Sequence, residues 1–146
     1  MKGTASLQAD ERAVLAANSA FYEALESLDL VRMDAVWLHE DWVQCLHPGW
    51  ELLQGWEHVQ ESWASIFRST VQQRVSISRP RACIMGDTAW VSCVEHVTST
   101  FEAEFTTARV ETLNIFVRRG GQWRMVHHHT TPVSDRISTE PSHTVQ

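Results

Sequence analysis

The hydrophobic pattern of this chain changes its period once, near residue 70, and this change limits the fold more than any other feature. Before it, apolar residues recur at the three- and four-residue spacing of a helix. After it, apolar and polar residues alternate as they do in half-buried strands. Helices followed by a run of strands are the order of an α+β domain, in which the helices cover one face of an antiparallel sheet.

Three helices are predicted in the first half of the chain. The longest follows Ser6, which can serve as its N-cap, and runs to about Leu28. Asp29 can cap a short helix from Leu30 to Leu38, and a third helix ends near Ser69. The apolar faces of these helices hold Val14, Ala17, Phe21, Leu25 and Leu28, then Leu30, Met33 and Trp37, then Trp56, Val59, Trp63, Ile66 and Phe67.

Long antiparallel strands are predicted in the second half, with turns at Gly86-Asp87 and Gly120-Gly121. A short strand over Asp41–His47 precedes the third helix, and the long strands span Val71–Ile84, Thr88–Thr100, Phe105–Arg118 and the stretch from Gln122 to Pro132. A strongly twisted sheet curls around its helices, which rarely fill the whole concavity. We therefore expect a pocket between the helices and the sheet.

The last strand carries three consecutive histidines. Strict alternation places His127 and His129 on the same face as Trp123 and Met125, and His128 on the other face with Val126. Pro132 removes a backbone donor and ends the strand. This pattern predicts two imidazoles in the pocket beside a tryptophan.

Composition narrows the class of protein. The net charge of −6 argues against a nucleic-acid partner, and no apolar run is long enough to span a membrane. The start of the chain does not resemble a signal peptide, so a cytoplasmic location is expected. The three cysteines lack the spacing of a zinc site, and no glycine-rich nucleotide motif is present, so neither a metal nor another cofactor is predicted. The seven tryptophans suit a pocket for a flat organic ligand.

Three stretches together resemble the nuclear transport factor 2-like superfamily, in particular its SnoaL-like branch and the kinase II association domains. They are the helix Val14–Leu28 with Met33-Asp34-Ala35-Val36-Trp37, the segment from His47-Pro48-Gly49-Trp50 through Leu53-Gln54-Gly55-Trp56 to Ser62-Trp63, and Arg118-Arg119-Gly120-Gly121-Gln122-Trp123 with His127-His128-His129. The resemblance covers roughly Leu7 to Pro132. It implies a cone-shaped, cystatin-like α+β fold over residues 1–133, a homodimer, and a pocket on the concave face of the sheet. Residues 134–146 are expected to form a flexible tail.

Only some of the site residues known in this superfamily have counterparts in this chain. Where kinase association domains carry basic residues on two adjacent strands, this chain has Glu95 and Asn114, so its pocket would not favour the same anionic ligands. Ketosteroid isomerases pair a carboxylate base with a tyrosine, and the single tyrosine here is Tyr22 on the first helix. SnoaL-type cyclases use a carboxylate base with a histidine nearby, a role for which His129 is available.

Glu95 and His129 are the predicted catalytic pair. Glu95 shares its strand face with Val91 and Cys93, and a carboxylate on an apolar face either lines a pocket or is neutralised, for example by Arg109. Burial without a cation would raise its pKa towards that of a useful base. His129 would serve as the acid/base partner.

The remaining predicted ligand-binding residues are of three kinds. Asn114 can orient a ligand carbonyl or satisfy a local backbone group. His127 and His47 can line the pocket, or they can hydrogen-bond the backbone of the sheet edge and the turn at Pro48-Gly49. The helix-side wall is assigned to Trp37, Trp50 and Trp63, although core packing is the better interpretation for at least one of them. A metal bound by the strand histidines would need a third ligand from Glu95, His96 or His47, and none is predicted.

The sequence leaves open two functions from different classes. The first is a protein that binds a small organic ligand in an apolar, Trp-lined pocket and acts on it as an acid/base enzyme of isomerase, cyclase or dehydratase type. The alternative is a non-catalytic dimeric association or regulatory module. An arginine paired with Glu95 would favour the module.

Overall fold

The computed structural model describes residues 3–101 and 103–133 of the chain. Three helices precede the four long strands, in the order expected for an α+β domain. The elements are α1 (Thr4–Ser27), α2 (Leu30–Val36), β1 (Gln44–Leu46), β2 (Leu53–Gln54), α3 (Trp56–Ser69), β3 (Thr70–Met85), β4 (Thr88–Phe101), β5 (Glu104–Arg119) and β6 (Gln122–Pro132). The predicted tail over 134–146 lies outside the described residues.

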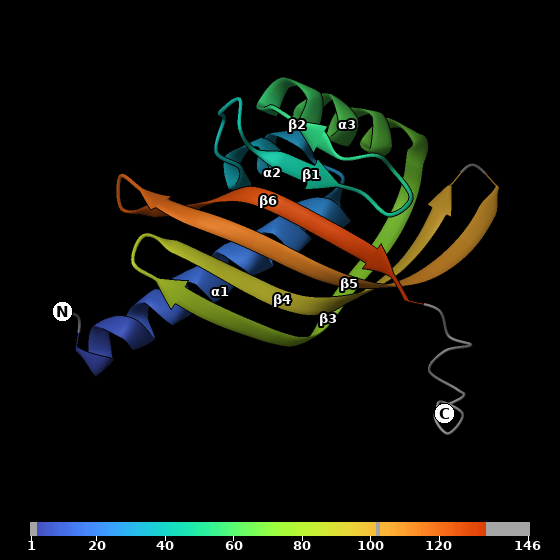
Figure 1. Ribbon diagram of the computed structural model, residues 1–146. Helices are drawn as coiled ribbons and strands as arrows, with labels where there is room; N and C mark the ends of the chain where they lie inside the picture. The colour runs from blue at the N-terminus through green and yellow to red at the C-terminus, as the bar shows by residue number, and fades with distance from the viewer. Residues whose placement is uncertain (1–2, 102, 134–146) are drawn as a thin grey trace, which may run out of the picture.

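The six strands form one curved sheet in the order β2-β1-β6-β5-β4-β3. The long strands β3 to β6 pair antiparallel in a meander, as expected, whereas β1 pairs parallel to β6. Figure 1 shows that α1 crosses one face of the sheet, with α2 and α3 on the same side. None of the described helices is long and apolar enough to cross a membrane.

Local sequence signals set the helix ends. Leu28 adopts a left-handed conformation (φ 58°) and its amide donates to the Ala24 carbonyl, which ends α1. The Asp29 carboxylate accepts from the amides of Val31 and Arg32 and so caps α2. This helix ends earlier than predicted because Trp37 turns into extended backbone and bridges to Met125 of β6.

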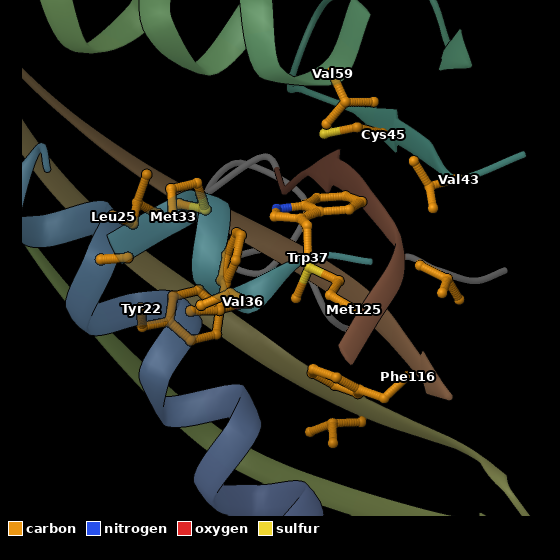
Figure 2. Packing of buried hydrophobic residues seen from close by; sticks show 14 of the residues in the cluster. Tyr22, Leu25, Met33, Val36, Trp37, Val43, Cys45, Val59, Phe116 and Met125 are labelled. Atoms are coloured by element: carbon orange, nitrogen blue, oxygen red, sulfur yellow. The ribbon is translucent and has the colours of Figure 1, made fainter. Parts of the chain in front are cut away.

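The core fills the space between the helices and the concave face of the sheet. Its largest fully buried side chains include Trp37, Phe21, Phe116, Met33 and Met125. Figure 2 shows Trp37 between Met125 of β6 and the Val43–Cys45 region, with Phe116 beneath them. Burial of these side chains supplies the main stabilisation of the fold, at roughly 1.5–3 kcal/mol for each aliphatic or phenyl group.

A β-bulge in β6 changes which histidine faces the core. Ile115 of β5 pairs with His127, but the next residue, Phe116, pairs with Met125, so Val126 has no partner in the register. The strand therefore shifts its phase, and Val126 joins the core together with Met125. The prediction that His127 and His129 face the helices is wrong for this reason: His128 points inward.

The outward face of the sheet also differs from simple alternation. Alternation places Val126 on the side away from the helices, but the bulge brings it into the core. Val110 is buried for a different reason: it pairs with Glu95 and lies on the inward face of β5, as regular alternation with Thr112 and Asn114 requires. The strand register places Trp90 and Val94 of β4 at outward positions, together with Leu113 and Ile115 of β5.

Candidate functional site

Four buried polar side chains meet on the concave face of the sheet. Tyr22 comes from α1, Glu95 from β4, Asn114 from β5 and His128 from β6, and each is at most 6% exposed. The Tyr22 hydroxyl lies 2.7 Å from Glu95 Oε2. Asn114 Nδ2 lies 3.1 Å from the Tyr22 oxygen, and Asn114 Oδ1 lies 2.6 Å from His128 Nδ1. We call these four residues the polar cluster.

The hydrogen bonds of the polar cluster have a fixed direction. The Asn114 carbonyl oxygen can only accept, so His128 Nδ1 carries the proton that it shares with Asn114. The Asn114 amide nitrogen donates to the Tyr22 oxygen and, at 2.9 Å, to Asn18 Oδ1. The Tyr22 hydroxyl can then donate to Glu95. His128 Nε2 is left as an acceptor, 4.0 Å from Glu95 Oε2.

Burial decides the protonation of the polar cluster. It raises the pKa of Glu95, against the opposing effect of the hydrogen bond from Tyr22. It also raises the pKa of Tyr22, with the Glu95 charge adding to the shift, so Tyr22 keeps its proton. Burial holds the pKa of His128 well below its usual range, and His47 contributes in the same direction. At neutral pH the site therefore holds a neutral imidazole, a neutral phenol and a carboxyl group with a raised pKa.

No arginine or lysine pairs with Glu95 among the residues that the structure describes. The ion pair between Glu95 and Arg109 that the sequence left open does not form. Arg109 lies opposite His96 of β4, at an outward position of the sheet. A carboxylate that is desolvated without a cation costs free energy of folding.

A second buried polar group lies beside the cluster. His47 Nε2 is 2.8 Å from Ser62 Oγ, and the Ser62 hydroxyl donates to the Val59 carbonyl at 2.6 Å. His47 Nε2 must therefore carry a proton and donate to Ser62. Burial lowers the pKa of His47 to about 4, so it is neutral at physiological pH. The Trp63 ring lies between the two histidines, with its centroid 4.6 Å from that of His47 and 6.0 Å from that of His128.

The predicted site residues divide into two sets. Glu95, Asn114, His47 and Trp63 are brought together on the concave side. The others are not: Trp37 is a core residue, Trp50 is 44% exposed next to the His47 ring, and His127 and His129 stack on the outward face of β6.

Sequence reasoning missed Tyr22, Asn18 and His128 as site residues. Asn18 and Tyr22 are one helical turn apart on α1, on the same face as Val14, Phe21 and Leu25. Two polar residues within an apolar helical stripe are a sequence signal from which Asn18 and Tyr22 could have been predicted as site residues. His128 could not be assigned in the same way, because its orientation depends on the bulge.

The polar cluster is closed to solvent in this structure. Five hollows among the described residues lie elsewhere on the molecule, and none of them is lined by the four cluster residues. One lies between α1, α2 and the start of β6, and another lies beside the stacked rings of His39 and Trp56. A ligand can reach Glu95 only if the wall formed by side chains such as Phe21 and Trp63 opens.

The curved sheet with its helices on one face is the cystatin-like fold, which the chain shares with proteins of the nuclear transport factor 2-like family. Residues 14–134 match the family model of the SnoaL-like domain, and the chain belongs to that family.

Two similar solved structures have the same architecture. A candidate dehydratase of the NTF2-like family from Streptomyces avermitilis is 32% identical, with a TM-score of 0.82 over 87% of this chain and 98% of that chain. A candidate calcium/calmodulin-dependent protein kinase type II association domain from Thiobacillus denitrificans is 30% identical, with a TM-score of 0.70 over 82% of this chain and 94% of that chain.

A curated relative is the F-box protein SKIP8 of Arabidopsis thaliana, which is 28% identical over 131 residues. The match covers 90% of this chain and 54% of that protein, so the chain spans about half the length of its relative.

Proposed function

We propose that this protein binds a small, neutral organic molecule beside the polar cluster and acts on it by acid/base chemistry, as a dehydratase, isomerase or cyclase. The observation that carries the proposal is Glu95, a 4% exposed carboxyl group that faces a neutral tyrosine hydroxyl and a neutral imidazole instead of a cation. Ionisable groups whose burial costs free energy of folding are typical of functional sites.

The gap between Glu95 and His128 favours a ligand that donates a hydrogen bond. When Glu95 is ionised, its Oε2 and His128 Nε2 are both acceptors, and they face each other across 4.0 Å. A ligand hydroxyl or enol could donate to either of them and relieve this contact. We therefore expect a hydroxyl group close to a carbonyl in the substrate.

The proposed step begins with Glu95 as the base. Its carboxylate takes a proton from the carbon next to the ligand carbonyl, and the electron pair of that C–H bond forms a carbon–carbon double bond. In a dehydration the adjacent C–O bond breaks, and the new carboxylic acid of Glu95 returns its proton to the leaving oxygen, which departs as water. To stabilise charge on the carbonyl oxygen, the Tyr22 hydroxyl would turn its proton from Glu95 to the ligand. Asn114, itself held by His128, would keep the phenol oxygen in place.

The rival function is a non-catalytic, dimeric association module. Two observations favour it: the polar cluster is closed, and the identity to the candidate kinase association domain is close to that of the candidate dehydratase. In that case the buried carboxyl group would be a remnant that only lowers stability.

A ligand screen followed by matched variants distinguishes the two functions. Neutral aromatic and polyketide-like hydroxy ketones would be screened by thermal shift, since a ligand that binds only the folded state raises its stability. Turnover of each hit would be followed by the absorbance of the conjugated product and by its loss of the mass of water.

We expect Glu95→Gln to bind the hit without turning it over, and Glu111→Gln, a change at an exposed carboxylate on β5, to retain the parent rate. Turnover by Glu95→Gln at the parent rate would refute the assigned base. A screen with no hit and no turnover would favour the association module.

A further inference from the structure

The side-chain amide of Asn18, next to the polar cluster, is only half used. Asn18 is 1% exposed, and its Oδ1 accepts from Asn114 Nδ2 at 2.9 Å. Because the oxygen faces Asn114, the nitrogen of the Asn18 amide points elsewhere, and it has no hydrogen-bond partner among the residues that the structure describes. A buried N–H group without a partner is rare in folded proteins and costs free energy of folding.

The unpartnered amide and the Tyr22 hydroxyl approach the same point of the site. Asn18 and Tyr22 are one turn apart on α1, and both are buried against the sheet. The Tyr22 oxygen lies 3.4 Å from Cys93 Sγ. Burial raises the pKa of the Cys93 thiol, and contacts with Tyr22 and Asn18 oppose this shift, so the Asn18 amide also borders the sulfur. The two donors therefore meet in front of Cys93, beside Glu95 on the same strand.

We propose that Asn18 is a second donor to the carbonyl oxygen of the ligand, so that its Nδ2 and the Tyr22 hydroxyl form an oxyanion-binding pair. This inference rests on the proposed function, in which Glu95 takes a proton from the carbon next to the carbonyl. The electron pair of that C–H bond forms a carbon–carbon double bond, and the π pair of the carbonyl moves to its oxygen. Two donors that face this oxygen stabilise the enolate more than the neutral ketone.

The two donors differ in how ready they are for the ligand. Tyr22 donates to Glu95 in this structure, so its proton must turn before it can serve the ligand. Asn18 Nδ2 has no such bond to break. Its direction is set by Asn114, which donates to Asn18 Oδ1 and is itself held by His128. A donor that is oriented before the ligand arrives needs no reorganisation during the reaction.

A phenolate tests the pair, because it is a stable enolate with its charge on oxygen. The probe is para-nitrophenol, whose ionised form is recognised by its yellow absorbance. Glu95→Gln imitates the protonated carboxyl group that an enolate would face, so this variant is the background. We expect it to bind the ionised probe, and Asn18→Leu in the same background to bind at least about tenfold more weakly, because hydrogen bonds to a charged oxygen are strong.

The matched control removes a different unpartnered N–H group. Trp37 Nε1 is buried in the core and also lacks a partner among the described residues. Trp37→Phe in the Glu95→Gln background should bind the probe as the background does. Thermal melts would establish that each variant is folded, and Asn18→Ala replaces Asn18→Leu if the latter does not fold.

Side-chain amide resonances give a readout that a purely structural role of Asn18 would not change. In ¹⁵N-labelled Glu95→Gln, the Asn18 amide is assigned by its absence when Asn18→Leu is added. Its proton resonance should move downfield on binding of para-nitrophenol. The amide of Asn114 should move much less, because it already donates to Asn18 and Tyr22.

Three results would each overturn the oxyanion-binding pair. They are a Glu95→Gln variant that does not bind the ionised probe, equally tight binding after Asn18→Leu, and an Asn18 amide resonance that does not move. An equal loss of binding in Trp37→Phe would also overturn it, since any disturbance of the core would then suffice. The proposed function fails by a different result, turnover of a screened ligand by Glu95→Gln at the parent rate, which does not involve the probe.

Discussion

The Tyr22 hydroxyl donates to Glu95 Oε2 over 2.7 Å, although the two residues are 73 positions apart in the chain. This bond joins the middle of α1 to the centre of β4. It places a phenol with a raised pKa against a carboxyl group with a raised pKa, because both are buried. The same contact therefore fixes the first helix on the sheet and creates the reactive point of the proposed site.

Glu95→Gln should stabilise the protein at neutral pH. The pKa of Glu95 is raised by folding, so the folded state holds the proton more tightly than the unfolded state does. Stability from this group is then fully present below the ordinary pKa of 4.5 and is lost as pH rises through the folded value. Chemical denaturation should show Glu95→Gln more stable by roughly 1–3 kcal/mol near neutral pH, with the difference vanishing at acid pH. Glu111→Gln serves as the exposed control.

His47→Gln should reduce the loss of stability in mild acid. His47 has an ordinary pKa of 6.5 that burial lowers to about 4, so the unfolded state takes up the proton first. The parent should lose roughly 3 kcal/mol through this group as pH falls from 6.5 to about 4. Unfolding free energies measured across this range should fall less steeply in His47→Gln. A slope equal to that of the parent would show that His47 protonates normally in the folded state.

Asn114→Leu should be strongly destabilising despite its similar volume. Asn114 is fully buried and hydrogen-bonds to Asn18, Tyr22 and His128. Removing it leaves three buried polar groups short of a partner, at a cost of roughly 2–4 kcal/mol. Denaturant unfolding would measure this loss. A change below about 0.5 kcal/mol, the range of ordinary surface substitutions, would mean that water replaces the amide.

Deleting Val126 should remove the bulge and leave His128 in its inward position. Met125 pairs with Phe116 and His127 with Ile115, so without Val126 the two strands would alternate regularly and His128 would still face Asn114. Circular dichroism and thermal melting should show a folded deletion variant with a loss of stability close to that of Val126→Ala, because both changes remove the packing of this side chain. A deletion variant that fails to fold would show that the bend at the bulge is needed to curve the sheet.

We also expect the chain to be a homodimer. Trp90, Leu113 and Ile115 lie at outward positions of the central strands, and Leu113 is 37% exposed. Apolar side chains on one sheet face are typical of surfaces that pair with another copy. Sedimentation at micromolar concentration should give twice the chain mass. Leu113→Lys should shift the equilibrium towards monomer, and a parent that is already monomeric would contradict this expectation.

Much of the architecture followed from local pattern. The period change near residue 70, the Asp29 cap and the Gly120-Gly121 turn, where φ is 61° and 79°, are read from neighbouring residues and occur as predicted. The inward orientation of Glu95 and Asn114 was also predictable, because β4 and β5 pair without a bulge and alternation holds along them. These features depend on backbone preference and on the burial of one strand face, which the sequence records residue by residue.

The orientation of the histidines and the composition of the site were decided by tertiary structure. Either phase of β6 places Trp123 and Met125 inward, and only the bulge at Val126 adds a third apolar side chain to the core and turns His128 towards Asn114. Likewise, the sequence of α1 shows only an apolar stripe, and the packing of α1 against β4 is what brings Tyr22 into contact with Glu95. A one-residue irregularity and a helix-to-sheet contact depend on energies summed over distant partners, and no local spacing in the sequence encodes that sum.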